Sequence, residues 1–180
     1  MISPDRILNF WADAGPCNWW LKTDTFDASI RKLFVDLHRQ AAEGGNDSWE
    51  MLSPDAALAL VIVLDQFSRH IHRGRPRAYA CDDKAVKIVH RVIARGDDRR
   101  MRPDVREFIY MPLMHSENLP DQNLSVAETA RWLSAEDLAS AEGHRDIIAS
   151  FGRFPHRNGI LGRTSTPEEG EFLKDGGFAG

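Results

Sequence analysis

The stretch SPDAALALVIVLDQFSRH, residues 53–70, decides the fold of this chain. Ser53 is a favoured N-cap residue, and Pro54 suits the first helical position, where its missing N–H would have no helical partner. Every residue from Ala56 to Leu64 is apolar, so a helix here has no face suited to water. The run is also much shorter than the roughly 20 residues that span a bilayer. We therefore predict a central helix surrounded by the rest of the protein, and no membrane segment.

Helical periodicity continues on both sides of this stretch, whereas clean alternation of apolar and polar residues is hard to find. Capping residues mark where helices begin, and glycine or proline marks where they end. We expect starts at Pro4, near Asp24, at Pro54, at Asp82 or Asp83, at Pro103, and at the caps Ser125, Ser134 and Thr166. Ser125 and Glu128 have the spacing of a capping box. Gly15 and Pro16 should end the first helix.

These elements predict an all-α fold of seven to eight or more helices joined by short turns. Short turns favour antiparallel helix hairpins, either stacked as a tetratricopeptide-like α-solenoid or closed as a bundle. A sequence repeat of fixed length would identify the solenoid, and none is found.

The composition is that of an ordinary globular protein, with 180 residues of which 42% are hydrophobic and 28% charged. A single domain of this length buries about 70% of the surface that its unfolded chain exposes, so it needs no disulfide or metal. We expect one domain over residues 1–173 and a loose tail over residues 174–180.

Several features predict a cytoplasmic protein. Cys17 and Cys81 are too few for a disulfide framework and show no CxxC spacing, which fits a reducing compartment. Asp5 and Arg6 stand where a signal peptide would need its apolar core. A net charge of -4 argues against general nucleic-acid binding, which depends on many uncompensated Lys and Arg contacts. Neither nucleic acid nor a membrane is expected as a partner, and the oligomeric state is not predicted.

The first polar cluster, DQFSRHIHRGRPR at residues 65–77, carries the central helix into a turn. Asp65 and Arg69 can pair on one helix face, and Gln66 or a distant partner can complete their hydrogen bonds. One interpretation is a structural ion pair that closes a helix hairpin. The other is a site in which Arg69, Arg73 and neighbouring guanidinium groups hold a phosphate or carboxylate. The excess of arginine, 18 Arg against 5 Lys, fits either codon bias or such anion recognition.

The second cluster, HSEN at residues 115–118, follows an expected break in a helix. His115 beside Glu117 suits a general acid or base, since a carboxylate orients and charges an imidazole. Histidine and glutamate are common metal ligands, so a metal site could be formed by His115, Glu117, His144 and His156. The spacing of these four residues matches no compact ligand motif such as HExxH. We expect neither a metal nor a cofactor. The candidates for catalysis are His115, Glu117 and His156.

The third cluster, GRFPHRNGILGRTST at residues 152–166, is a loop rich in hydrogen-bond donors, and such loops can hold anions. Thr166 is expected to cap the next helix rather than bind a ligand, because the glutamates that follow it would repel an anion there. The basic groups of the loop could instead turn toward Glu117 and Asp121, or toward the first cluster, as a structural network. The candidates for ligand binding in this loop are Arg153, Arg157 and Asn158.

Motifs along nearly the whole chain carry a resemblance to a known family. They are FW at 10–11, WW at 19–20, LDQFSR at 64–69 with RG at 73–74, PLMHSEN at 112–118, and FGRFPHRN with ILGR within 151–163. In these motifs the chain resembles the bacterial domain-of-unknown-function family 924, whose members look like tetratricopeptide-type helical proteins. The resemblance implies an all-α fold of helix hairpins and brings no established activity. Its motif positions include Asp65, Gln66, Arg69, Arg73, His115, Glu117, Arg153, His156, Arg157 and Asn158, whereas His70 and His72 depart from the usual family residues.

Three functions remain open. The leading hypothesis is a binding module with an Arg- and His-rich pocket for a small anionic ligand or an acidic peptide. Its predicted ligand-binding residues are Asp65, Gln66, Arg69, Arg73, Arg153, Arg157 and Asn158. The second hypothesis is an enzyme that uses His115 or His156 as general acid or base, oriented by Glu117. The third is a structural protein whose polar clusters lock helix hairpins and bind no ligand.

Overall fold

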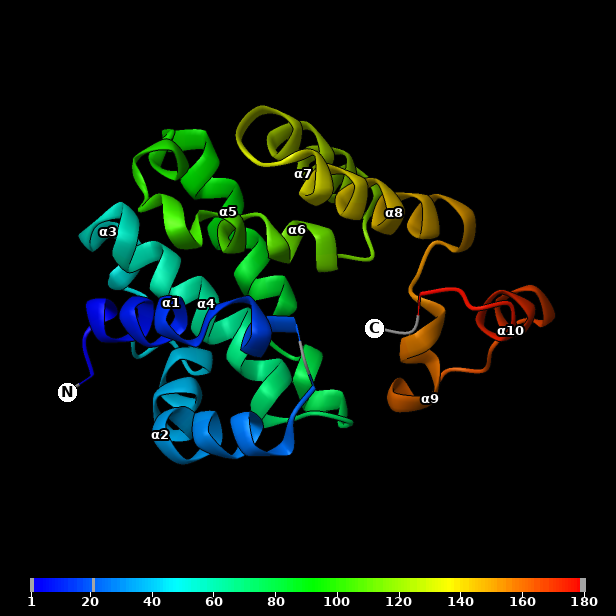
Figure 1. Ribbon diagram of the computed structural model, residues 1–180, viewed down its shortest axis with the longest axis horizontal. Coiled ribbons are helices and arrows are strands. Elements are labelled where there is room, and N and C mark those ends of the chain that lie inside the picture. The colour runs from blue at the N-terminus through cyan, green and yellow to red at the C-terminus, as the bar shows by residue number, and fades with distance from the viewer. Residues whose placement is uncertain (1, 21, 179–180) are drawn as a thin grey trace. The chain divides into compact units, whose positions relative to one another are not determined.

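The computed structural model describes residues 2–20 and 22–178, and that part of the chain contains helices and no strand (Figure 1). It holds ten α-helices and four 3₁₀ helices. The chain forms two compact units. The first comprises the residues up to Arg73 together with Arg77–Pro112, and the second comprises Gly74–Pro76 together with the residues from Leu113 onward.

The first unit is assembled around one helix, α4 (Pro54–Ile71). The elements along the chain to the end of this unit are α1 (Pro4–Trp20), α2 (Asp24–Ala42), α3 (Trp49–Leu52), α4, η1 (Pro76–Tyr79), α5 (Asp82–Arg95), η2 (Asp97–Arg100), η3 (Pro103–Ile109) and the start of α6 (Met111–His115). Helices α1, α2, α3 and α5, together with η2 and η3, all pack against α4 (Figure 1).

The burial of α4 confirms the prediction of a surrounded central helix. Every residue from Ala56 to Ser68 is buried. The Ser53 hydroxyl accepts a hydrogen bond from the backbone N–H of Ala56 at 3.0 Å, which satisfies one of the amides left free at the helix start. Burial of the apolar run removes about 1.5–3 kcal/mol of unfavourable hydration for each large side chain. This helix therefore lies at the centre of the core of the first unit.

Helix α1 is interrupted at Gly15, where the sequence predicts the end of a helix. The first helical segment ends there as predicted, because Gly15 has a non-helical φ of 66° and ψ of 176°, and a second helical segment follows directly and continues to Trp20. A positive φ is readily adopted by glycine alone, so the helix can change direction at this residue. The indole N–H of Trp19 then donates to the carbonyl of Trp11 at 2.7 Å. The kink thus turns the last part of α1 back onto its own first part.

The second unit contains the end of α6, then α7 (Leu119–Trp132), α8 (Ala135–Phe151), η4 (Pro155–Arg157), α9 (Asn158–Leu161) and α10 (Pro167–Lys174). Helices α7 and α8 form a helix hairpin (Figure 1). Capping boxes begin α8 at Ser134 and α10 at Thr166, as the sequence predicts.

The predicted cap at Ser125 is wrong. The cap of α7 lies seven residues earlier, where the side chain of Asn118 accepts a hydrogen bond from the Asp121 backbone N–H. Ser125 and Glu128 lie inside α7 and are buried. Their spacing is that of a capping box, but the same spacing places both residues on one side of a continuous helix.

The all-helical fold is confirmed, and its helix hairpins are consistent with a tetratricopeptide-like arrangement. None of the described helices is long and apolar enough to cross a bilayer. The single domain over residues 1–173 stays a prediction, as does the loose tail. Within that tail, residues 179–180 lie outside the described residues.

Candidate functional site

Arg69, near the end of α4, lies between two carboxylates of the first unit. Its Nη1 is 3.1 Å from Asp65 Oδ1, and its two terminal nitrogens donate to the carboxylate of Asp82, each at 3.1 Å. The Gln66 amide donates to Asp65 Oδ2 at 2.7 Å. Burial alone would lower the pKa of Arg69, but the two carboxylates outweigh it and raise that pKa. The predicted pair of Asp65 and Arg69 thus forms, with Asp82 as its distant partner.

Arg73 and His70 share a different carboxylate, that of Asp27 on α2. Arg73 donates to both oxygens of Asp27, through Nη2 at 2.8 Å and also through Nε, and His70 Nδ1 lies 2.7 Å from Asp27 Oδ1. Burial raises the pKa of Asp27, but the hydrogen bonds from Arg73 and His70 outweigh it, so the pKa is lowered. Asp27 therefore stays ionised and joins α2 to the end of α4.

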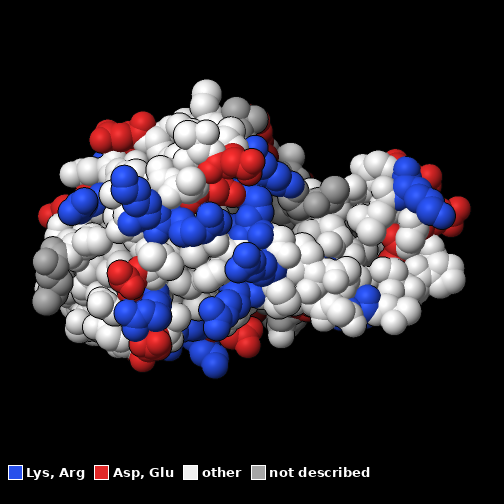
Figure 2. Space-filling view, turned by 90° about the horizontal axis from the view of Figure 1, so that it is seen from below, with Lys and Arg blue, Asp and Glu red and all other residues white. Residues whose placement is uncertain are grey.

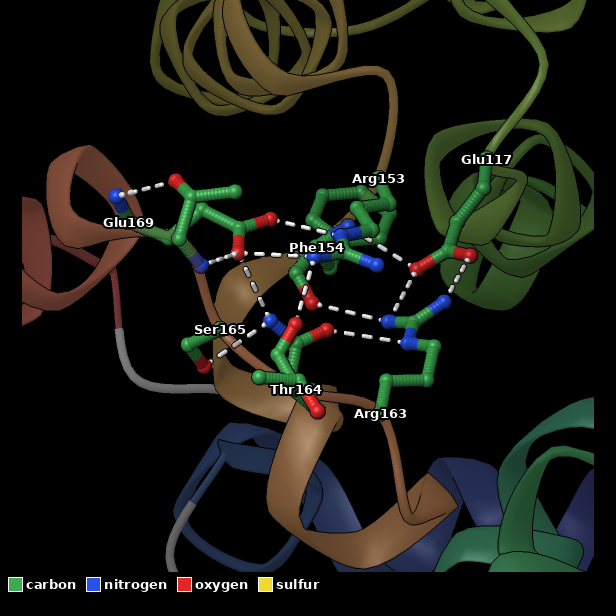
Figure 3. A network of polar contacts seen from close by, with 9 residues as sticks. Glu117, Arg153, Phe154, Arg163, Thr164, Ser165 and Glu169 are labelled. Carbon is green, nitrogen blue, oxygen red and sulfur yellow. Dashed lines mark hydrogen bonds and ion pairs between the residues drawn. The ribbon is translucent and has the colours of Figure 1, made fainter.

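In the second unit, Glu117 and Arg163 form a forked ion pair (Figure 3). Arg163 donates to Glu117 through Nη1 at 2.6 Å and Nη2 at 3.0 Å, and the backbone N–H of Phe154 donates to the same carboxylate at 2.8 Å. The Arg163 side chain also donates to the Phe154 carbonyl at 3.1 Å. Burial raises the pKa of Glu117. The hydrogen bonds from Arg163 and from the Phe154 amide lower it by a larger amount, so the net shift of the pKa is downward. One of the two arrangements expected for the third cluster, a turn toward Glu117, is therefore present.

Glu169 is the second carboxylate of this network, and its exposed fraction is only 2%. Arg153 donates to it through Nε at 2.6 Å and Nη2 at 2.8 Å, and the Thr166 backbone N–H donates at 2.7 Å. The hydrogen bonds of Arg153, chiefly, lower the pKa of Glu169 to about 2. Asn158 joins the two halves of the network, because its Nδ2 donates to Glu169 at 3.0 Å and its Oδ1 accepts from Arg163 at 2.9 Å.

Four guanidinium groups of the predicted clusters are thus bound to carboxylates of their own unit. They belong to Arg69, Arg73, Arg153 and Arg163. Forked pairs of this kind orient loops and helix ends, and buried ones resist removal of either partner. On the face in Figure 2, Lys and Arg side chains also lie among Asp and Glu side chains. The geometry of these four groups is that of structural ion pairs.

Another group of basic side chains, which lies in the second unit, is arranged around an aromatic ring. The Arg157 guanidinium lies 4.4 Å from the ring centre of Phe154, and the rings of His144 and His156 lie 5.8 Å and 5.6 Å from it. Phe178 contacts both imidazoles, at 4.6 Å from His144 and 5.1 Å from His156. These five residues are called the Phe154 cluster below.

Both imidazoles of the Phe154 cluster are held in the neutral form. Burial, with the positive charge of Arg157 next, lowers the pKa of His156 to about 4. Burial and Arg157 also lower the pKa of His144, although its hydrogen bond to the Ser140 carbonyl opposes them. Among the described residues, no hydrogen-bond partner is found for the buried Nδ1 of His156. A buried polar atom of this kind calls for an explanation, and a ligand is one.

A cavity of about 490 Å³ adjoins the Phe154 cluster, since His144 and Phe178 belong to its wall. The volume falls within the range of small-molecule sites, which are mostly apolar with a few polar groups. The cavity is lined by Ala139, Ser140, Gly143, His144, Asp146, Ile147, Ser150, Phe151, Phe172 and Phe178.

The remaining predicted residues are His115 and Glu117. His115 is half-buried at the end of α6, and both oxygens of Glu117 are engaged by Arg163. Within residues 2–20 and 22–178, no group of three or more His, Cys, Asp or Glu side chains is placed to hold a metal ion.

Sequence reasoning missed several members of these sites. Three carboxylates bind arginines of the predicted clusters, those of Asp27, Asp82 and Glu169. Of these, only Glu169 is indicated by a local sequence pattern, its three-residue spacing from the cap residue Thr166. For His144 the sequence suggests only the role of a metal ligand, whereas the structure places it in the Phe154 cluster. Phe178 lies in the segment expected to be loose, where it contacts two imidazoles.

Comparisons with known proteins agree on the family and give no activity. A family model described as a bacterial protein of unknown function (DUF924) matches residues 7–177. The chain is 40% identical to a structurally solved protein of unknown function from Agrobacterium tumefaciens, with a TM-score of 0.91; the match covers 96% of this chain and 97% of that one. No curated protein matches the chain.

Proposed function

The chain therefore belongs to the DUF924 family of bacterial proteins of unknown function, and we propose that it is a binding module for a small anionic ligand held by the Phe154 cluster. The observation that supports this proposal is the arrangement of Arg157, His144 and His156 around one ring, beside a cavity of ligand size. The residues of the proposed site all come from the second unit.

The charge of the Phe154 cluster favours an anion. Arg157 lowers the pKa values of both imidazoles, so the local potential around them is positive. Glu117 opposes this effect at His156, but its carboxylate is already bound by Arg163. An anion placed beside the imidazoles would raise their pKa values and be bound more tightly in return.

This proposal divides the predicted ligand-binding residues into two groups. Arg157, together with the catalytic candidate His156, is proposed to contact the ligand. The others, Asp65, Gln66, Arg69, Arg73, Arg153 and Asn158, are proposed to hold helix ends and loops in place through their contacts within the chain. A general acid–base role for His156 is less well supported, because a pKa of about 4 makes its neutral imidazole a weak base.

The test is NMR of the imidazole nitrogens of the whole chain. Acetate, succinate and phosphate are added at constant ionic strength, with chloride as the reference anion. At least one of them is expected to shift the signals of His144 and His156 toward the protonated form, with no such shift at the exposed His90 of α5. His144→Gln and His156→Gln variants assign the two signals.

Two outcomes would contradict the proposal. One is the absence of a shift at both imidazoles with every anion. The other is an equal shift at His90, which would show general ion binding rather than a site.

A further inference from the structure

The geometry points to a more definite ligand: we infer that the anion bound by the Phe154 cluster carries an apolar body, which occupies the cavity bounded by α8, α10 and Phe178. The ligand class is a medium-chain carboxylate. This inference rests on the proposed function and deepens it, because it adds the part of the ligand that His144, His156 and Arg157 do not recognise.

The cavity wall provides room for an apolar body. Phe151 and Phe172 contact one another with ring centres 5.1 Å apart, and Ile147 extends this surface along α8. Gly143 has no side chain, and a Cβ added there would meet no atom within 4 Å. The wall is thus apolar where Phe151, Phe172 and Ile147 lie and open at Gly143.

His144 connects the apolar wall with the basic cluster. It lines the cavity, contacts the Phe154 ring and contacts Phe178. Its Nδ1 lies 2.8 Å from the Ser140 carbonyl and donates to it, so Nε2 is the nitrogen that remains for a ligand. A carboxylate at Nε2 would stabilise the protonated ring, and the attached chain would lie along the phenylalanines.

The other ionisable residue of the wall does not compete for this position. Asp146 is an exposed carboxylate, and its Oδ1 accepts a hydrogen bond from Arg145 Nε at 2.6 Å. Its charge is therefore partly balanced outside the cavity. His144 is the one basic side chain among the residues that line the cavity. The positive charge nearest His144 is that of Arg157, which lies outside the wall, so an acid is favoured at the His144 end and a neutral hydrocarbon elsewhere.

Three ligands that differ in one property each test the inference by calorimetry on the full chain. Octanoate has both the anionic group and the apolar body, acetate has the anionic group alone, and octanol has the body alone. Octanoate is expected to bind on the order of 100-fold more tightly than acetate, which corresponds to burial of about half of its additional methylenes. Octanol is expected to bind more weakly than octanoate, because it has no charge for His144 and Arg157.

A matched pair of variants locates the apolar body. Gly143→Leu fills the cavity and is expected to weaken octanoate at least about tenfold while acetate is unchanged. Gly170→Leu on α10 is the control, because a Cβ there also meets no atom within 4 Å but Gly170 does not line the cavity. Leucine is a better helix former than glycine, so neither change should weaken its helix. Circular dichroism and thermal unfolding check the fold of both.

The results separate this inference from the function on which it rests. Equal affinities for octanoate and acetate would overturn the apolar body and leave anion binding by the Phe154 cluster intact. Unchanged octanoate binding in Gly143→Leu would overturn the placement in this cavity. An octanol affinity equal to that of octanoate would overturn the carboxylate class, and with it the proposed function.

Discussion

Replacing Arg69 by methionine removes the cation from the most deeply buried ion-pair network of the first unit. The change keeps an unbranched apolar side chain at the position and deletes the guanidinium. Two carboxylates then lose their shared partner, that of Asp65 with an exposed side-chain fraction of 0% and that of Asp82 with 12%. Gln66 still donates to Asp65, but it carries no charge. Arg69→Met therefore removes the guanidinium that two carboxylates in or near the core share.

Removal of one member of a buried ion pair costs about 3–5 kcal/mol, since the remaining charge stays away from water. Whole domains are stable by only about 5–15 kcal/mol, so Arg69→Met should remove a large fraction of the stability of the first unit. In a chain of this size, each kcal/mol corresponds to about 2–4 °C in Tm. The expected fall in Tm is therefore about 6–20 °C.

Urea unfolding followed by tryptophan fluorescence measures this loss in the first unit alone. Trp132 belongs to the second unit, and the four other tryptophans belong to the first, so a Trp132→Phe background confines the signal. Arg39→Ala is the control. The Arg39 side chain is 59% exposed and pairs with exposed carboxylates on α2, so this change should cost about 0–1 kcal/mol.

The reasoning would be refuted if Arg69→Met lost no more stability than Arg39→Ala. A second variant tests the cause of the loss. Adding Asp82→Asn to Arg69→Met removes the charge of one of the two carboxylates that Arg69 bound, so part of the lost stability should return. A further loss on adding Asp82→Asn would show that charge burial is not the reason for the effect.

Two further predictions concern local features of the helices. Ser53→Ala should lower the free energy of unfolding by about 1 kcal/mol, because it removes the hydrogen bond that Ala56 donates at the start of α4. The control is Ser48→Ala, at a position whose side chain makes no capping bond, and it should cost much less. Equal losses of stability in thermal unfolding would contradict the assignment of Ser53 as the cap of α4. Glu169 has a folded pKa of about 2 and an ordinary pKa of 4.5, so it adds stability that is fully present above pH 4.5 and is lost as the pH falls toward 2. The Glu169→Gln variant should be less stable than the unchanged protein at neutral pH, and its stability should fall less between pH 4.5 and pH 2. The measurement is acid unfolding followed by Trp132 fluorescence. Parallel stability curves for the two proteins would contradict the prediction.

The helices were predictable where their signals are local. The start of α4 at Ser53 and the capping boxes of α8 and α10 depend on residues three positions apart, and all three formed. Ser125 failed because a capping-box spacing occurs equally well inside a helix, where tertiary packing buries it. Gly15 and Pro16 mark the break in α1 correctly, but they do not indicate that a second helical segment follows at once. Spacing alone does not distinguish these outcomes.

The candidate site was predictable to a smaller extent, for a related reason. Asp65 and Arg69 are four residues apart on one helix, so their pairing follows from helix geometry alone. The contact between Arg73 and Asp27 joins residues 46 positions apart, and the contact between Arg163 and Glu117 also joins residues 46 positions apart. Such partners are selected by the packing of whole helices, which no local pattern specifies.

The burial of α4 on all sides also has a consequence for synthesis of the protein. The helix is complete once residue 71 has been made, but the last element that covers it, η3, ends at Ile109. Ribosomes add about 5–20 residues each second, so the apolar run Ala56–Leu64 waits about 2–8 seconds for its last neighbours. During that time the growing chain presents an apolar helix to the cell, which is the kind of surface that chaperones cover.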